Sequence, residues 1–255
     1  MEAKKTRRLL AKHIMEICGI CFALLAFAAC TALLPARAMA GSFPRIDGST
    51  ADAALSGSEG LQQEEPSQEL SERMRGMSPG EQIEYLLDAK AMGENSADIN
   101  FFLGVAMFST GKLDSAAIFF QEAIAIDSTY SKAYVNLGIV LDSQGKKGQA
   151  ELMYKRAIEV DPSDVLAHCH LGFLYHSKRR MREAMAYYLK ALELDPNSPQ
   201  AHYNLGFAFA DARMFKEALR EWELVIQLDP DGELGKTAGE NVGLIKQYLE
   251  LEAPE

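Results

Sequence analysis

The side chains best suited to metal chemistry lie together in His168-Cys169-His170, with His176 further along the chain. Imidazole and thiolate groups are ligands that zinc favours. Neighbouring residues on a helix, however, point about 100° apart, and Cys169 and His176, which share a face, are separated by two turns, about 10 Å. That separation is too large for one ordinary metal ion. The spacing favours packed rings and a packed thiol, and we expect no metal ion.

A second motif, Gly235-Lys236-Thr237, matches the end of a phosphate-binding loop. The full pattern requires a glycine five residues before Gly235, and that position is Pro230. A loop that enters the last helix explains the motif better. The sequence contains no paired carboxylates or Ser/His/Asp set that rises above background. We therefore predict a protein that is not an enzyme, with no catalytic residues and no cofactor.

A period of 34 residues organises the chain between residues 97 and 230. Leu-Gly pairs occur at 103–104, 137–138, 171–172 and 205–206. The same step repeats a small residue followed by a large aromatic one: Ala116 and Phe120, Ala150 and Tyr154, Ala184 and Tyr188, Ala218 and Trp222. An aspartate closes each unit at 127, 161, 195 and 229, and the last three lead into proline. A register kept across so many columns without an insertion indicates a repeat architecture.

These columns resemble the tetratricopeptide repeat (TPR) family. The resemblance implies two antiparallel helices per repeat, stacked into a right-handed superhelix. The residue types agree with it independently, because Gly and Ala let two helices approach closely and proline cannot continue a helix. We expect an all-α fold, a right-handed α-solenoid of about four TPR helix pairs with N- and C-terminal capping helices. The expected pairs are 98–110 with 113–126, 131–144 with 147–160, 165–178 with 181–194, and 199–212 with 215–228.

The four repeats are assigned to residues 97–130, 131–164, 165–198 and 199–232. Residues 69–96 should form the N-terminal cap, whose helix starts at Ser78-Pro79-Gly80-Glu81 with Ser78 as N-cap and Glu81 reaching back. Residues 233–255 should form the C-terminal cap, a helix with one polar face, which a solenoid needs for solubility. The first repeat has Asn100 where the second has Tyr134, and Ser128 in place of proline. We expect it to be the loosest of the four.

Residues 1–40 have the form of an export segment. A basic start precedes an apolar run from Ile17 to Leu34, and Ala38-Met39-Ala40 supplies a cleavage site, as in a secretory signal peptide. A retained membrane anchor is the alternative, since 18 apolar residues reach the lower limit for spanning a bilayer, and Ala28-Ala29-Cys30 leaves lipidation at Cys30 open. We expect a periplasmic or otherwise exported protein, or one anchored with its TPR domain outside the cytoplasm. Residues 41–68 are polar and predict a flexible tether.

The chain has 255 residues and a formal net charge of −10. Residues 1–40 hold six of the 26 basic and two of the 36 acidic side chains, so the remainder carries a net charge of −14. An acidic surface repels phosphate, and we therefore expect no nucleic-acid partner. Cys169 is the only cysteine after residue 40, which leaves stability to packing and not to a disulfide.

The resemblance to TPR proteins implies that the first helix of each pair lines a concave face that binds a peptide or a partner helix. Matching each repeat to the family position by position places twelve residues on this face: Phe101, Val105, Phe108, Val135, Asn136, Ile139, Cys169, His170, Phe173, Tyr203, Asn204 and Phe207. Family members that clamp a carboxylate terminus use Lys, Arg and Asn there, and only Asn136 matches that set. One row on this face comprises Phe101, Val135, Cys169 and Tyr203, the next comprises Val105, Ile139, Phe173 and Phe207, and a polar edge beside them comprises Asn136, His170 and Asn204. The two apolar rows indicate instead an apolar peptide or an amphipathic helix as ligand. Burial of these rows, against each other or under residues 41–78 or the last helix, is the alternative.

The sequence thus predicts a non-catalytic protein–protein interaction scaffold, most simply an adaptor in envelope protein assembly. The second hypothesis is a periplasmic chaperone-like holder of apolar client segments. The partner, the assembly and the oligomeric state are not specified by the sequence.

Overall fold

The computed structural model describes residues 66–252, and all of their regular structure is helical. The helices are α2 (Pro66–Arg73), α3 (Pro79–Ala91), α4 (Ala97–Ser109), α5 (Leu113–Ile126), α6 (Ser131–Ser143), α7 (Lys147–Val160), α8 (Val165–Ser177), α9 (Met181–Leu194), α10 (Pro199–Asp211), α11 (Phe215–Leu228) and α12 (Glu233–Glu252). The expected repeat helices agree with these bounds to within one residue. The predicted export segment, Cys30 and most of the predicted tether lie outside the described residues.

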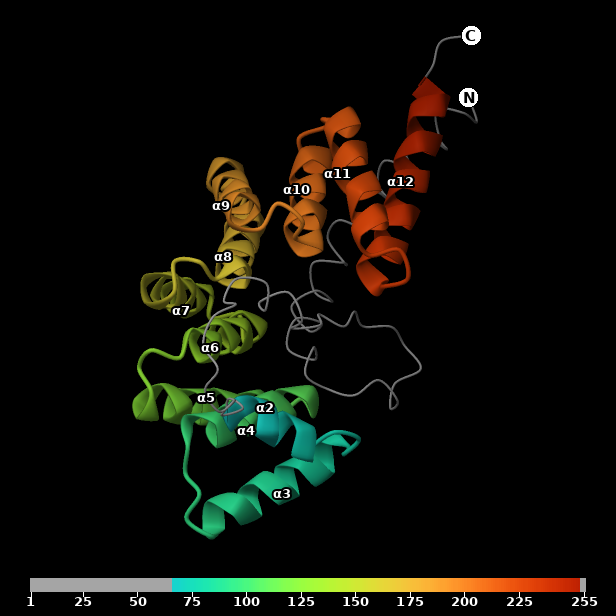
Figure 1. Cartoon of the computed structure of the whole chain (residues 1–255). Coiled ribbons are helices and arrows are strands. Elements are labelled where there is room, and N and C mark those ends of the chain that lie inside the picture. The colour runs from blue at the N-terminus through green and yellow to red at the C-terminus, as the bar shows by residue number, and fades with distance from the viewer. Residues whose placement is uncertain (1–65, 253–255) are drawn as a thin grey trace, which may run out of the picture.

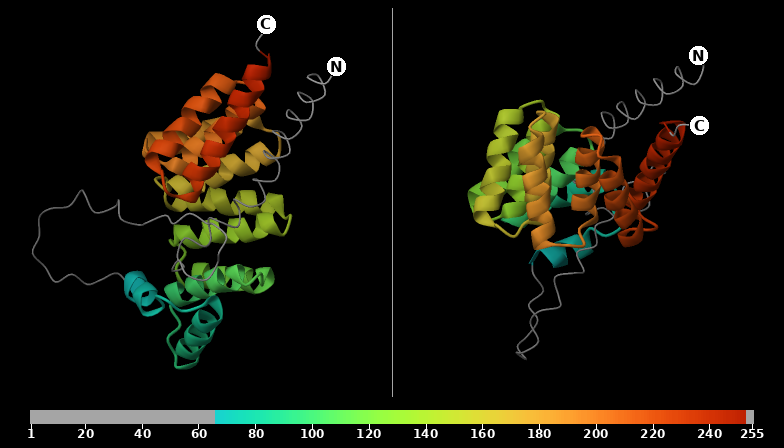
Figure 2. Two further views of the ribbon diagram at one scale, coloured as in Figure 1. Left: turned by 90° about the vertical axis from the view of Figure 1, so that its right-hand side faces the viewer. Right: turned by 90° about the horizontal axis from the view of Figure 1, so that it is seen from above.

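Consecutive helices pack as antiparallel pairs, α4 with α5, α6 with α7, α8 with α9 and α10 with α11, and the pairs stack into a solenoid. The left panel of Figure 2 shows them in successive layers from α3 at one end to α12 at the other. The stack twists along its length, since α4 and α5 lie across the view of Figure 1 whereas α10 and α11 stand upright in it. The predicted all-α TPR solenoid is confirmed.

The recurring columns of the sequence form the interior of the stack. The repeated alanines, from Ala116 to Ala218, have no exposed surface, and the aromatic that follows each is fully or almost fully buried. Each of these rings lies against the Leu-Gly glycine of its partner helix. Because glycine has no side chain, the ring can approach the helix backbone directly. The columns are therefore packing positions, as the sequence indicated.

Helix α3 of the N-terminal cap begins as expected. Ser78 Oγ accepts a hydrogen bond from the backbone N–H of Glu81 (3.4 Å), and Glu81 Oε2 accepts one from the backbone N–H of Ser78 (2.7 Å). This reciprocal pair is a capping box, which satisfies two donors at the start of α3. The predicted tether, in contrast, extends too far by a few residues, because α2 already begins at Pro66, which suits the first helical position.

Two kinds of connection alternate along the stack. Within a pair, the turn holds one residue in the left-handed region, with φ near 75° at Gly111 and Gly145 and near 60° at Arg179 and Arg213. Between pairs, an aspartate ends the second helix. Asp161 Oδ1, for example, accepts a hydrogen bond from the backbone N–H of Ser163 (2.9 Å). These two connections lie on opposite edges of the solenoid.

Within residues 66–252, no helix combines the length and the apolar character that crossing a bilayer requires.

Candidate functional site

The twelve predicted groove residues lie on the first helices of the four pairs, α4, α6, α8 and α10. Three of them are half-buried: Asn136, His170 and Phe173. Nine are buried: Phe101, Val105, Phe108, Val135, Ile139, Cys169, Tyr203, Asn204 and Phe207. The two apolar rows therefore do not present an open apolar surface along the described repeats. The role of these residues in binding stays a prediction.

Packing within and between repeats accounts for much of this burial. The Phe101 ring lies 5.8 Å from that of Phe120 and 5.1 Å from that of Tyr130, measured between centroids. In the last repeat, Phe207 packs edge to face against both Tyr203 and Trp222. These rings fill the space between helices, so their apolar area is used in holding the repeats together.

An accessible cavity remains where α6 and α8 begin, at the boundary of the second and third repeats. Its volume is about 370 Å³, and its lining is Tyr130, Ser131, Lys132, Val135, Asn136, Asp161, Asp164 and Leu166. Val135 and Asn136 belong to the predicted site. The other six were not among the predicted site residues, because they lie in the loop between repeats or in the first turn of a helix. The sequence signal that could have indicated them is their position next to the recurring columns, at the start of the helices.

The cavity is built on a cap of α8. Asp164 Oδ1 accepts a hydrogen bond from the backbone N–H of Ala167 (3.0 Å), while Asp164 Oδ2 accepts one from the Ser131 hydroxyl (2.8 Å). One carboxylate thus fixes the start of α8 and ties it to the start of α6. The apolar side chains of Val135 and Leu166 complete the lining. The result is a small, preformed apolar hollow with charged groups at its rim, the usual form of a recognition pocket.

The polar edge predicted beside the apolar rows consists of Asn136, His170 and Asn204. Asn136 Nδ2 donates to the carbonyl of Lys132 (2.8 Å), and Asn204 Oδ1 accepts from Gln200 (3.1 Å). The His170 ring stacks on Tyr154 with centroids 5.6 Å apart. Desolvation lowers the pKa of His170 below its ordinary value, so the ring is neutral at pH 7. These side chains therefore present hydrogen-bonding groups and no charge at pH 7.

The histidines and the cysteine considered for metal chemistry are hydrogen-bonded or buried within the repeats. His168 Nε2 lies 3.1 Å from the carbonyl of Pro162, and His176 Nε2 lies 2.8 Å from Asp211 Oδ2. Cys169 is buried, and desolvation raises the pKa of its thiol well above the usual value, which keeps it protonated. Among residues 66–252, no group of three or more His, Cys, Asp or Glu could hold a metal ion.

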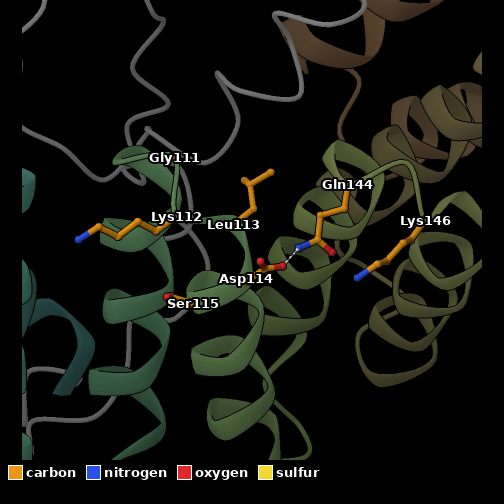
Figure 3. A pocket seen from close by; sticks show the side chains of 7 residues that line it. All are labelled: Gly111, Lys112, Leu113, Asp114, Ser115, Gln144 and Lys146. Atoms are coloured by element: carbon orange, nitrogen blue, oxygen red, sulfur yellow. Dashed lines mark hydrogen bonds between the residues drawn. The ribbon is translucent and has the colours of Figure 1, made fainter.

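A larger hollow of about 590 Å³ lies at the opposite edge, between the turns of the first two helix pairs (Figure 3). Its lining is Gly111, Lys112, Leu113, Asp114, Ser115, Gln144 and Lys146. Gln144 Nε2 donates to Asp114 Oδ1 (2.9 Å), and Lys112 and Lys146 project on either side of that bond. The hollow is polar, in contrast to the cavity at α6 and α8.

Comparison with known proteins agrees with the fold. Family profiles described as "Tetratricopeptide repeat" match residues 81–131 and 131–164, and one described as "TPR repeat" matches residues 180–212. The match that begins at residue 81 takes in α3, α4 and α5, consistent with α3 being the second helix of a repeat. The comparison with curated proteins gives no match.

Solved structures share the fold at low sequence identity. "MamA 41-end from Desulfovibrio magneticus RS-1" is 23% identical, with a TM-score of 0.53 over 64% of this chain and 91% of that one. A chain of the "APC/C hetero-tetramer Cut9-Hcn1" is 15% identical, with a TM-score of 0.64 over 72% of this chain and 36% of that one. The repeated columns, the paired helices and the three profile matches lead to one conclusion: the chain is a tetratricopeptide repeat protein.

Proposed function

We propose that this protein is a non-catalytic adaptor that works outside the cytoplasm in envelope protein assembly, and that it holds an apolar peptide or an amphipathic helix against its concave face. That it is a protein–protein interaction scaffold follows from the fold, since a TPR domain implies such a scaffold and TPR proteins are typically non-catalytic. The location rests on the sequence pattern of residues 1–40, which predicts an export segment.

The observation that carries the site is the cavity at the start of α6 and α8. Its volume of about 370 Å³ lies near the lower end of the range for ligand pockets, so it would receive one or two side chains of a peptide and not a whole helix. Val135 and Leu166 would contact an apolar anchor, while Asn136 would hydrogen-bond to the ligand's backbone. Lys132, Asp161 and Asp164 at the rim would select its orientation.

Burial of the apolar rows favours an adaptor over a chaperone-like holder. A holder of varied apolar clients needs a broad exposed apolar surface, and Ile139, in the middle of the second row, is only 1% exposed. A small pocket with a polar rim instead selects one sequence among many. We therefore place the adaptor first and the holder second.

Photo-crosslinking tests both hypotheses. A crosslinking amino acid at Asn136 should give protein adducts in intact cells, whereas one at Leu152, which is 53% exposed on the outer helix α7, should not. A fixed set of adducts supports the adaptor, and a broad set supports the holder. Equal adducts at both positions, or none at either, would contradict a concave binding site.

A substitution experiment completes this test. With the crosslinker kept at Asn136, Leu166→Glu should abolish the adducts, because it places a carboxylate in the apolar part of the cavity, and Leu152→Glu is the matched control. Substitution of Ile139 by aspartate is unsuitable, since a charge at a buried position would unfold the repeat.

A further inference from the structure

The two edges of the solenoid carry opposite charge. Turns within helix pairs, together with the first residues of the following helix, occupy residues 110–116, 144–150, 178–184 and 212–218, which contain nine basic and three acidic side chains. The connections between pairs, in windows of equal length at residues 127–133, 161–167, 195–201 and 229–235, contain one basic and seven acidic side chains. An acidic protein thus has one edge with a net charge of +6, here called the basic edge, and one of −6.

Contacts between successive turns show that the basic edge is continuous. Gln144 of the second turn donates to Asp114 beside the first (2.9 Å), Lys147 donates to Ser177 (3.0 Å), and the Arg179 guanidinium lies 3.7 Å from Asp211. Figure 3 shows the first of these contacts, with lysines projecting on both sides. The four turns therefore form one row along the stack.

Most of the positive charge in this row is available to a ligand. Arg179 is 84% exposed. Lys178 and Arg180 pair with Glu151 and Glu183. In the part of the chain that the structure describes, no ion pair engages the exposed side chains of Lys112, Lys146, Arg182, Arg213 and Lys216.

The backbone adds to this charge. The second helices α5, α7, α9 and α11 all begin without a side-chain cap, so their N-terminal N–H groups and dipoles contribute further positive potential to the same edge. Arg179 and Arg213 also hold the left-handed conformation, with φ of 60° and 59°, where the first two repeats have glycine. The last two repeats thus carry a cation at the outermost corner of the turn, where glycine would be less strained.

We propose that the basic edge binds an extended acidic polypeptide segment. Packed helices are spaced about 10 Å apart, and an extended chain advances about 3.3 Å per residue. A glutamate or aspartate at every third position would therefore meet successive turns. The guanidinium groups of Arg179 and Arg213 suit carboxylates, which they can hold with two parallel hydrogen bonds.

Other anionic partners fit this edge less well. A nucleic acid has a denser line of charge, which the acidic edge and the net charge of −10 would repel at close range. A membrane is flat, whereas the row of turns follows the twist of the stack seen in Figure 1, so only part of it could meet a bilayer at once. A flexible chain can follow a twisted edge.

The test uses fluorescence anisotropy with the full chain and two labelled peptides of equal composition. One repeats Glu-Gly-Gly, and the other gathers its glutamates in a single block. We expect tighter binding of the spaced peptide, weakening as salt increases. The variant R179G/R213G should lose about tenfold in affinity, as expected for two exposed charge contacts of about 0.7 kcal/mol each. The variant R156Q/R220Q removes the same charge from the outer helices α7 and α11 and should bind as the unchanged protein does.

Several results would overturn the proposal. Equal weakening in both double variants would indicate attraction to net charge only. Equal affinity for the two peptides, or no binding, would contradict recognition of acidic residues at every third position. Preference for anionic lipid vesicles would assign the edge to a membrane, and salt-sensitive self-association lost in R179G/R213G would assign it to a second copy of the chain. Leu166→Glu should leave peptide binding unchanged, which separates this edge from the cavity at the start of α6 and α8.

Discussion

Trp222 of α11 lies so close to Gly206 of α10 that a Cβ atom at residue 206 would be 2.6 Å from the indole Cδ1. The indole Nε1 also donates a hydrogen bond to the carbonyl of Tyr203 (3.1 Å), which fixes the ring in this place. The same approach recurs in every repeat, between Gly104 and Phe120 (2.6 Å), Gly138 and Tyr154 (2.5 Å), and Gly172 and Tyr188 (2.6 Å). The Leu-Gly column is thus the point at which the two helices of a pair come into contact.

Gly206→Ala should therefore destabilise the fold, although alanine is the better helix former. Overpacking against a buried, hydrogen-bonded ring costs about 1–3 kcal/mol, and the gain in helix propensity offsets about 1 kcal/mol of it. Gly148 in α7 is the matched control, because a Cβ atom at residue 148 would have no neighbouring atom within 4 Å. Gly148→Ala should stabilise by up to about 1 kcal/mol. Urea unfolding of both variants checks the opposite signs, and stabilisation by Gly206→Ala would contradict the close approach.

Substitutions at the left-handed turns, where Arg179 and Arg213 lie, should also change stability in opposite directions. Arg179→Gly and Arg213→Gly should each stabilise the protein by up to about 1 kcal/mol, because glycine relieves the left-handed backbone at these turns. Some of that gain is lost, since glycine increases the entropy of the unfolded chain. Gly145→Arg places the arginine side chain at the equivalent turn of the second repeat and should destabilise. Thermal melts decide the sign, and a loss of stability in both glycine variants would show that the arginine side chains hold the turns.

The sequence was sufficient to predict the helices because the same residue types recur at the same positions in all four repeats. Gly, Ala and the aromatics are confined to columns, and aspartate with proline ends each unit. The first repeat looked irregular, yet Asp127 Oδ1 accepts from the backbone N–H of Thr129 (2.9 Å) just as Asp161 accepts from Ser163. Ser128 can therefore replace proline without loss of the turn.

Side-chain environments were less predictable, because they depend on contacts between repeats. Asn100, which stands where Tyr134 does in the next repeat, is fully buried and receives a hydrogen bond from Lys90 of α3 (2.7 Å). Lys90 also pairs with Glu122 of α5 and lies 5.1 Å from the Phe119 ring centroid. The columns of the four repeats do not include Lys90, since it lies on α3, N-terminal to the first of the four. The burial of the apolar rows and the cavity at α6 and α8 likewise arise from neighbouring repeats and have no signature in one helix.

Glu151 links the second and third repeats, and its contribution should depend on acid pH. Hydrogen bonds from Lys155 and Lys178, together with one from Tyr175 (2.8 Å), lower its pKa to about 2. A lowered pKa means that the stabilisation is complete above the unfolded-state pKa near 4.5 and is lost as pH falls toward 2. Because Glu151 is partly exposed, solvent screening limits the effect of Glu151→Gln to about 1 kcal/mol.

Unfolding of Glu151→Gln measured at about pH 7 and about pH 2.5 should show this loss at neutral pH and a smaller one at acid pH. Glu159→Gln serves as the control, because within residues 66–252 its carboxylate pairs only with Arg156 of its own helix (2.6 Å). An equal loss of stability in the two variants at neutral pH would show that the contacts of Glu151 between repeats stabilise no more than an ion pair within one helix.

His202 should make the last repeat sensitive to pH in the opposite direction. Desolvation lowers its pKa, but hydrogen bonding to Glu221 (2.6 Å) and to the carbonyl of Pro196 (2.9 Å) outweighs it, so the net pKa is raised. A raised pKa means that the stabilisation is complete below the unfolded-state pKa near 6.5 and is lost as pH rises through the folded-state value. The protonated ring donates to both partners, whereas the neutral ring has one N–H for two acceptors. His202→Gln should therefore cost most at about pH 5.5, about 0.5–1 kcal/mol because Glu221 is partly exposed and screened by solvent, and less at about pH 8.5. Melting temperatures of both proteins across this range check the trend, and a cost that grows with pH would show that the neutral imidazole is the stabilising form.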